Sequence, residues 1–350
     1  FLGGARMYFI GVDHHKQASV MTVLDEDGRE LKTGRVPNFR RYVEEFLRPF
    51  HPFRAVLEAG RSSYVMADLL RELGGEVKMA NPVEVKAIAH ARIKTDKRDS
   101  RTLAQLLRAG LIPEVYQREA WNRRAQRVMR LRAHWVRKQT ELRNKIRALL
   151  AQQSEEIRLE VERQERGLFT QKGLEILKTL PVAGEDKMIL DDLVRGHREV
   201  AAHIKQSDGL VEALYSQLEE ASRIDTVPGF ATTLSVLAAV EIADIRRFAG
   251  PGQLHAYAGV VPSTYASGER QFHGHITKQG SAWLRWAVLE AVYPSIKKDL
   301  GLRILYQRLA KRKGPNVAKV AVARRLLTII YRILTERREY LPGLAKPSAA

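Results

Sequence analysis

Strand and helix patterns alternate over the first 115 residues, and this alternation limits the N-terminal part of the chain to an α/β fold. Asp25-Glu26-Asp27-Gly28, between the second and third apolar segments, is typical of a hairpin turn. Strands are predicted at Tyr8–Asp13, Ser19–Leu24, Glu30–Val36, Ala55–Glu58 and Glu76–Ala80. Helices are predicted from an N-cap at Asn38 to Phe46, over Ser62–Leu73, from Pro82 onward, and over Asp96–Arg108.

Three consecutive strands followed by helix–strand–helix–strand–helix is the element order of the ribonuclease-H-like fold. We therefore expect a sheet of this type within residues 7–117. The order follows from the pattern, whereas the fold name is an analogy. Met7 opens the first strand pattern directly, so we interpret Phe1–Arg6 as a leader or an added remnant.

Residues 118–222 carry helical patterns and no strand pattern. Val128, Leu131 and Trp135 keep helical spacing among many arginines, which indicates either a coiled-coil arm that contacts phosphates or an amphipathic helix with a solvated basic face. Residues 223–345 are predicted to form a third, mainly helical region. The residues expected to contact nucleic acid are Arg123, Arg124, Arg127, Arg130, Lys278, Lys311, Arg312 and Lys313.

Four acidic residues stand where a carboxylate is costly unless it has a function. Asp13 and Glu58 each end an apolar strand, and Asp96 and Asp99 are three residues apart on one helix face. Turn and capping roles explain these residues singly. Converging carboxylates repel one another, however, and a divalent cation relieves that repulsion. The joint pattern therefore predicts a site for one or two Mg²⁺ ions, with Mn²⁺ as a substitute.

The charge balance indicates what such a site would act on. The chain has 59 Lys and Arg against 40 Asp and Glu, a net charge of +19. An acidic pocket in so basic a protein favours metal-assisted chemistry on a polyanion, above all nucleic acid, over a merely solvated basic surface. The chain has no cysteine, which excludes disulfides and thiol catalysis and fits a cytosolic protein. No apolar run approaches the ~20 residues of a membrane-spanning helix.

Two histidines and two serines are weaker candidates for the site. His14 and His15 are surface histidines by default, and because side chains alternate along a strand, at most one shares the face of Asp13. Ser267, before Gly268, and Ser263 are candidate nucleophiles. Ser-Gly turns are common, so the residues alone favour a structural role for Ser267.

The motifs taken together resemble the insertion-sequence one-ten family of transposases along almost the whole chain. Gly11-Val12-Asp13, Glu58-Ala59-Gly60 and Lys94-Thr95-Asp96-Lys97-Arg98-Asp99 are similar to that family's Asp-Glu-Asp-Asp tetrad. Val227-Pro228-Gly229, Ser267-Gly268 and Ile276-Thr277-Lys278 are similar to its C-terminal domain. One departure is Ser100-Arg101, where an alanine and a variable residue are expected.

The resemblance implies a RuvC-like nuclease domain (7–117), a coiled-coil region (118–222) and a transposase domain (223–345). It implies an RNA-guided DNA recombinase, in which a noncoding bridge RNA pairs with donor and target DNA. The metal-binding tetrad then maps onto Asp13, Glu58, Asp96 and Asp99, and the nucleophile that becomes joined to DNA maps onto Ser267. A site that combines the tetrad of one protomer with the serine of another implies a homo-oligomer, at least a dimer and up to a tetramer, in the prokaryotic cytosol at the nucleoid.

Two other functions compete with this interpretation. The first is a metal-dependent nuclease of the Holliday-junction type, or a DNA invertase without a guide RNA, in which Ser267 is only structural. The second is a non-catalytic nucleic-acid-binding protein.

Overall fold

The computed structural model describes residues 6–60, 62–88, 96–164, 166–267 and 270–342, with only the backbone described for 264–267 and 270–273. The chain forms two compact units, residues 1–117 and 118–350. Among the described residues, none of the helices combines the length and apolar composition needed to cross a membrane.

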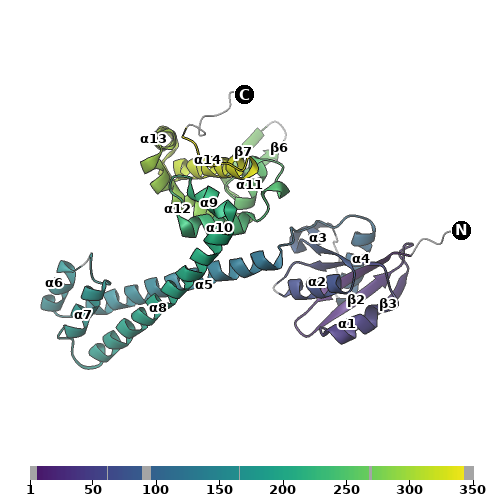
Figure 1. Cartoon of the computed structure of the whole chain (residues 1–350), viewed down its shortest axis with the longest axis horizontal. Coiled ribbons are helices and arrows are strands. Elements are labelled where there is room, and N and C mark those ends of the chain that lie inside the picture. Colours follow the sequence, from purple (N-terminus) through teal and green to yellow (C-terminus); the bar gives the residue numbers. More distant parts are fainter. Residues whose placement is uncertain (1–5, 61, 89–95, 165, 268–269, 343–350) are drawn as a thin grey trace. The chain divides into compact units, whose positions relative to one another are not determined.

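The first unit is a five-stranded mixed sheet with helices on both faces (Figure 1). The strand order is β3-β2-β1-β4-β5, with β1, β2 and β3 antiparallel and β1, β4 and β5 parallel. The elements are β1 (Tyr8–His14), β2 (Ala18–Leu24), β3 (Glu30–Pro37), α1 (Arg40–Leu47), β4 (Phe53–Glu58), α2 (Ser63–Glu72), β5 (Glu76–Ala80), α3 (Pro82–Ile88) and α4 (Asp96–Arg108). The five predicted strands and the ribonuclease-H-like order are therefore confirmed.

Alternation along the strands separates the two faces of this sheet. Ile10 and Val12 of β1 pack with Leu57 of β4 into one core, which α1 and α2 complete. Val56 of β4 faces the other way and packs with Leu103 of α4. Helices α3 and α4 thus cover the face opposite α1 and α2, and this face carries the acidic residues.

One predicted helix cap is wrong. Phe39, not Asn38, precedes the first turn of α1, and it makes no side-chain cap. The Asn38 amide instead accepts a hydrogen bond from the Ser19 hydroxyl (2.7 Å) and donates one to the carbonyl of His15 (2.7 Å). These two hydrogen bonds of Asn38 fix the turn that follows β1. Sequence spacing alone does not show this role.

The second unit begins with a long helical arm. The helices are α5 (Ala120–Leu150), α6 (Glu155–Arg163), α7 (Gln171–Thr179), α8 (Gly184–Gln217) and α9 (Glu219–Asp225). Helices α5 and α8 lie side by side along much of their length, and α6 and α7 lie at one end of the pair (Figure 1). Arg132 pairs with Asp208 at 2.6 Å, and the rings of Trp135 and His203 stack 4.3 Å apart.

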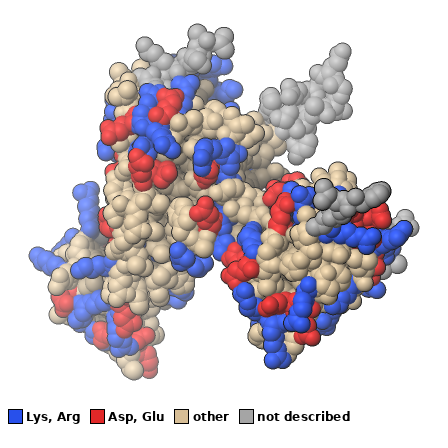
Figure 2. Space-filling view, turned by 45° about the vertical axis from the view of Figure 1, so that its right-hand side comes forward, with Lys and Arg blue, Asp and Glu red and all other residues tan. Residues whose placement is uncertain are grey.

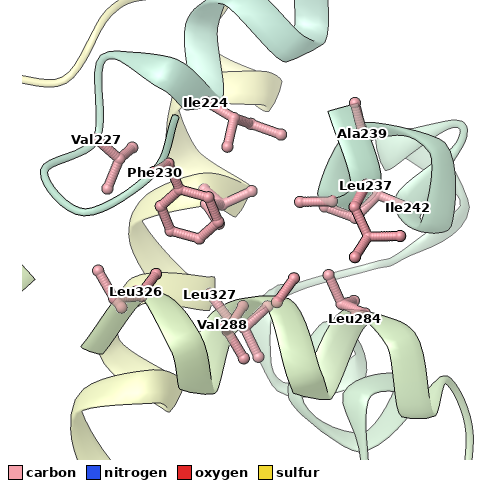
Figure 3. Close-up of a cluster of buried hydrophobic side chains, with 14 of the residues drawn as sticks. Ile224, Val227, Phe230, Leu237, Ala239, Ile242, Leu284, Val288, Leu326 and Leu327 are labelled. Atoms are coloured by element: carbon pink, nitrogen blue, oxygen red, sulfur yellow. The ribbon is translucent and has the colours of Figure 1, made fainter. Parts of the chain in front are cut away.

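The rest of the second unit packs around a large apolar core. It contains α10 (Thr232–Ile242), the short 3-10 helix η1 (Ile245–Arg247), α11 (Pro251–Ala258), β6 (Pro262–Ser267), β7 (Arg270–Ile276), α12 (Ala282–Lys298), α13 (Leu300–Lys313) and α14 (Pro315–Thr335). Figure 3 shows Leu237 of α10, Val288 of α12 and Leu327 of α14 converging in this core, with Phe230 from the preceding loop. A mainly helical C-terminal region is confirmed, but the β6–β7 hairpin within it was not expected.

Candidate active site

Two neighbouring strands bring Asp13 and Glu58 together. The parallel register of β1 and β4 places Val12 opposite Leu57, so Asp13 and Glu58 are the next pair along it. Val12 points into the α1–α2 core, so alternation directs Asp13 to the α4 face. Val56 packs on the α4 side, which directs Glu58 to the same face. Both carboxylates therefore lie at the C-terminal ends of neighbouring strands and point to the α4 face of the sheet.

A glycine allows α4 to lie directly on β1. A Cβ atom on Gly11 would lie 1.9 Å from the carbonyl oxygen of Ser100 and 2.6 Å from the backbone nitrogen of Ala104. The Ser100 side chain is buried, and its hydroxyl lies 2.8 Å from that of Thr22 on β2. The unexpected serine at position 100 therefore attaches the helix to the sheet and does not point toward the carboxylates.

The start of α4 completes the acidic group. Asp96 is the first residue of α4 and is exposed, and Asp99, one turn later, is half-buried. The His15 Nε2 atom lies 3.2 Å from an Asp13 carboxylate oxygen and 3.4 Å from one of Asp96. The donor atoms of Asp13, His15 and Asp96 all lie within 4.8 Å of one another.

The pKa of Asp13 is shifted by this crowding. Burial raises the pKa of Asp13 above its usual value, the nearby His15 opposes that shift, and the charges of Asp96 and Asp99 add to it. Burial and the two neighbouring carboxylates thus disfavour the charged form of Asp13, and a bound cation would relieve both effects. Burial, with the neighbouring His15, lowers the pKa of His14.

The donor set suits a divalent metal ion. Carboxylate oxygens are the ligands that Mg²⁺ and Mn²⁺ prefer, and the structure places Asp13 and Asp96 close enough to share one ion. Glu58 follows from the strand register and Asp99 from the helix face. His15, expected to be a surface histidine, also lies at this site; its place two residues after Asp13 was the signal that it shares that face.

The structure separates the two candidate serines. Ser263 Oγ donates a hydrogen bond to the carbonyl of His275 (3.0 Å), and a Cβ atom on Gly274 would meet that hydroxyl at 2.5 Å. The Ser263 hydroxyl is therefore hydrogen-bonded across the hairpin. The backbone of Ser267 ends β6, opposite Arg270, while its side chain and the residues Gly268 and Glu269 lie outside the described residues.

The predicted phosphate contacts on α5 differ in their surroundings. Arg124 and Arg127 are exposed. Arg130 is instead engaged inside the unit, where it pairs with Glu241 and lies 3.9 Å above the ring of Trp283. Lys278 and the last turn of α13, Lys311–Lys313, are exposed; cations at a helix C-terminus also complement the helix dipole. Figure 2 shows positive and negative side chains intermingled over the face that it presents.

Glu241, at the end of α10, is the buried anion that engages Arg130. It is about 2% exposed and also accepts hydrogen bonds from Gln126 (3.2 Å) and from the Ser281 hydroxyl (2.8 Å). Ser281 caps α12, the helix that follows the β6–β7 hairpin. The buried carboxylate thus links the start of the arm to the hairpin region, an arrangement that the sequence pattern did not indicate.

Comparison with known proteins agrees with this geometry. Residues 10–154 match a family model for transposases with a DEDD domain of the IS110 type, and residues 221–307 match the model described as "Transposase IS116/IS110/IS902 family". A probable family 20 transposase of Pseudomonas aeruginosa is 28% identical over 95% of this chain and 98% of its own length. The transposase for insertion sequence element IS1111A of Coxiella burnetii is 25% identical over 95% of this chain and 91% of its own.

The first matched segment covers most of the first unit and continues into the second, and the other lies within the second unit. The first contains the sheet, α4 and the start of the arm, and the second contains α10 and the β6–β7 hairpin. The DEDD domain implies a divalent metal as cofactor. The substrate of a transposase is DNA, which it cuts and joins. This chain belongs to the IS110/IS116/IS902 family of transposases, the DNA-cutting and DNA-joining enzymes of insertion sequences.

Proposed function

We propose that this transposase is an RNA-guided recombinase that cuts and rejoins DNA through a metal-bound acidic tetrad and a serine nucleophile. The observation that supports this most is the convergence of Asp13, Glu58 and the Asp96–Asp99 turn on one face of the sheet. In this proposal residues 7–117 hold the metal, 118–222 form the arm, and 223–345 carry the serine.

The roles of the acidic residues follow from their positions. Asp13 and Asp96 would hold one ion, and Glu58 and Asp99 would supply further carboxylates for it or for a second ion. A bound divalent ion supplies charge stabilisation at the scissile phosphate. The close packing of α4 on Gly11 keeps the Asp96–Asp99 turn at its distance from the strand ends.

Ser267 supplies the covalent step. Its hydroxyl oxygen forms a bond to phosphorus while the bond from phosphorus to one deoxyribose oxygen breaks, and the released sugar oxygen takes up a proton in place of the one that the serine loses. The phosphate is thereby held in a serine–DNA phosphodiester, and the hydroxyl of a new strand end can attack it and release the serine. Serine needs activation for such an attack. We propose that the tetrad of a second protomer provides it, which makes the active species at least a dimer.

Guide RNA and DNA are the proposed polyanionic partners. The net charge of +19 supports binding to phosphates, and exposed cations such as Arg124, Arg127 and Lys278 are candidate contacts. The guide would be a noncoding RNA from the element itself, pairing with donor and target DNA in the bacterial cytosol. Full recombination by RNA-free protein would contradict the guidance part of the proposal.

The decisive experiment follows labelled DNA on denaturing gels with the protein, Mg²⁺ and RNA transcribed from the element's flanks. Wild type should yield a covalent protein–DNA species, and both Ser267→Ala and Asp96→Asn should abolish it. Ser263→Ala is the matched control, because it removes one hairpin hydrogen bond worth about 1 kcal/mol and should keep the adduct.

The outcomes separate the competing functions. Cleavage without an adduct would identify a metal-dependent nuclease, and binding without cleavage a non-catalytic protein. Mixing Asp96→Asn with Ser267→Ala tests the composite site, since hybrid oligomers should recover some activity. If subunits exchange and no activity returns, both halves of the site come from one chain.

A further inference from the structure

His15 occupies the space between two of the proposed metal ligands. Its Nε2 atom lies 3.2 Å from an oxygen of Asp13 and 3.4 Å from one of Asp96. The three residues form a metal-capable group of His and acidic side chains, with donor atoms within 4.8 Å of one another. An imidazole nitrogen is thus part of the donor set, together with the carboxylates.

These separations resemble those of ligands around one ion. Metal–ligand bonds to a small divalent ion are about 2.1 Å long, so two ligands at right angles in octahedral geometry lie about 3 Å apart, and two opposite ligands about 4.2 Å. The His15 contacts of 3.2 and 3.4 Å are close to the right-angle value. The limit of 4.8 Å for the whole group allows Asp13 and Asp96 to take adjacent or opposite positions.

The backbone holds His15 at this place. Its carbonyl accepts a hydrogen bond from the Asn38 amide at 2.7 Å, and Asn38 is itself held by Ser19 on β2. The neighbouring His14 is differently employed: its Nδ1 lies 2.9 Å from the Ser19 hydroxyl and its Nε2 lies 3.1 Å from the Ser62 hydroxyl. Of these two adjacent histidines, only His15 presents a ring nitrogen to the carboxylates.

We propose that His15 is a direct ligand of the ion bound by Asp13 and Asp96, and that this nitrogen makes the site prefer a first-row transition ion, Mn²⁺, over Mg²⁺. The inference rests on the proposed metal role of the tetrad and adds to it a ligand outside the four carboxylates. The preference follows because Mn²⁺ shares the carboxylate ligands of Mg²⁺ but, as a first-row transition ion, also accepts an imidazole nitrogen, whereas Mg²⁺ is a hard ion that takes oxygen ligands.

The test is electron paramagnetic resonance on the full chain titrated with Mn²⁺ in the absence of nucleic acid. Electron spin-echo modulation from a directly bound ¹⁴N nucleus should be present in wild type and in His14→Ala, and absent in His15→Ala. Mn²⁺ affinity of His15→Ala should fall at least tenfold, since loss even of groups that only orient ligands costs 10–100-fold. Mg²⁺ affinity, measured by competition, should fall less.

Further variants keep the inference separate from the proposed function. His15→Asp should bind Mn²⁺ without nitrogen modulation, which excludes a general folding defect as the cause of the loss. If Asp13→Asn loses Mn²⁺ while His15→Ala binds it as wild type does, the His15 inference is overturned and the acidic site stands. If Asp13→Asn also binds as wild type does, both are overturned. Nitrogen modulation that persists in His15→Ala likewise overturns the inference.

Discussion

Replacing Gly11 by alanine tests how the carboxylates are brought together. The added Cβ atom would lie 1.9 Å from the Ser100 carbonyl oxygen, against at least 3.4 Å for ordinary van der Waals contact. Because the opposing atoms are backbone atoms of α4, no side chain can rotate away. The helix must therefore move off the strand by more than about 1 Å, and the Asp96–Asp99 turn moves with it.

Two effects of different size should follow from Gly11→Ala. Overpacking of a well-packed core typically costs about 1–3 kcal/mol, so the unfolding free energy of the first unit should fall by that amount. Displacement of catalytic groups by about 1 Å can cost about 100-fold in rate, so DNA cleavage should fall far more than folding does. The variant should be folded and nearly inactive.

The assay must read the first unit by itself. All four tryptophans lie in residues 118–350, so tryptophan fluorescence follows only the second unit and should not change. Hydrogen exchange of amides in β1 and α4 follows the first unit. Gly34→Ala is the matched control on the same sheet, because its Cβ atom would meet only the Phe46 ring, at 3.0 Å. Wild-type exchange and cleavage in Gly11→Ala would refute the reasoning.

Three further predictions concern the second unit. Glu241→Ala leaves the half-buried Arg130 beside Trp283 without its carboxylate, so the unfolding free energy should fall by about 1.5–3 kcal/mol in urea unfolding followed by tryptophan fluorescence; a loss below about 1 kcal/mol would contradict the ion pair. Burial lowers the pKa of His255 from 6.5 to about 4, so the unfolded state binds the extra proton and stability should fall as the pH drops from 6.5 toward 4; His255→Gln should lessen that fall, and an identical pH profile would count against it. Arg124→Gln with Arg127→Gln should reduce the slope of log affinity for nucleic acid against log salt by about one unit per lost phosphate contact, and an unchanged slope would show a merely solvated face.

Local patterns determined the secondary structure of the first unit and the placement of its acidic residues. Period-two alternation and turn residues predicted all five strands, because each strand buries its own apolar face whatever the register. The carboxylates at strand ends and at a helix start were visible for the same reason. The family resemblance came from short motifs in order, which need no knowledge of contacts.

Contacts between distant segments decided the rest. The sequence predicts Asn38 as a helix cap, yet its amide is hydrogen-bonded to Ser19 and to the carbonyl of His15. A short amide side chain can bond to any suitable partner that the fold brings near it. The sequence predicts Arg130 as a phosphate contact, but it pairs with Glu241, 111 positions further along the chain. Neither partner lies within one turn of helix or one strand, so sequence spacing carries no signal for it.

The sequence by itself determined the fold class and the family and singled out four acidic residues as candidate metal ligands, since these depend on local periodicity and on motif order. Only the tertiary structure decided that His15 lies between Asp13 and Asp96 and that Gly11 brings α4 onto the strand. The physical reason is that convergence depends on strand register and on the distance between helix and sheet. Both are set by packing between distant segments: the register pairs Val12 with Leu57, and the approach of helix to sheet brings Gly11 against Ser100.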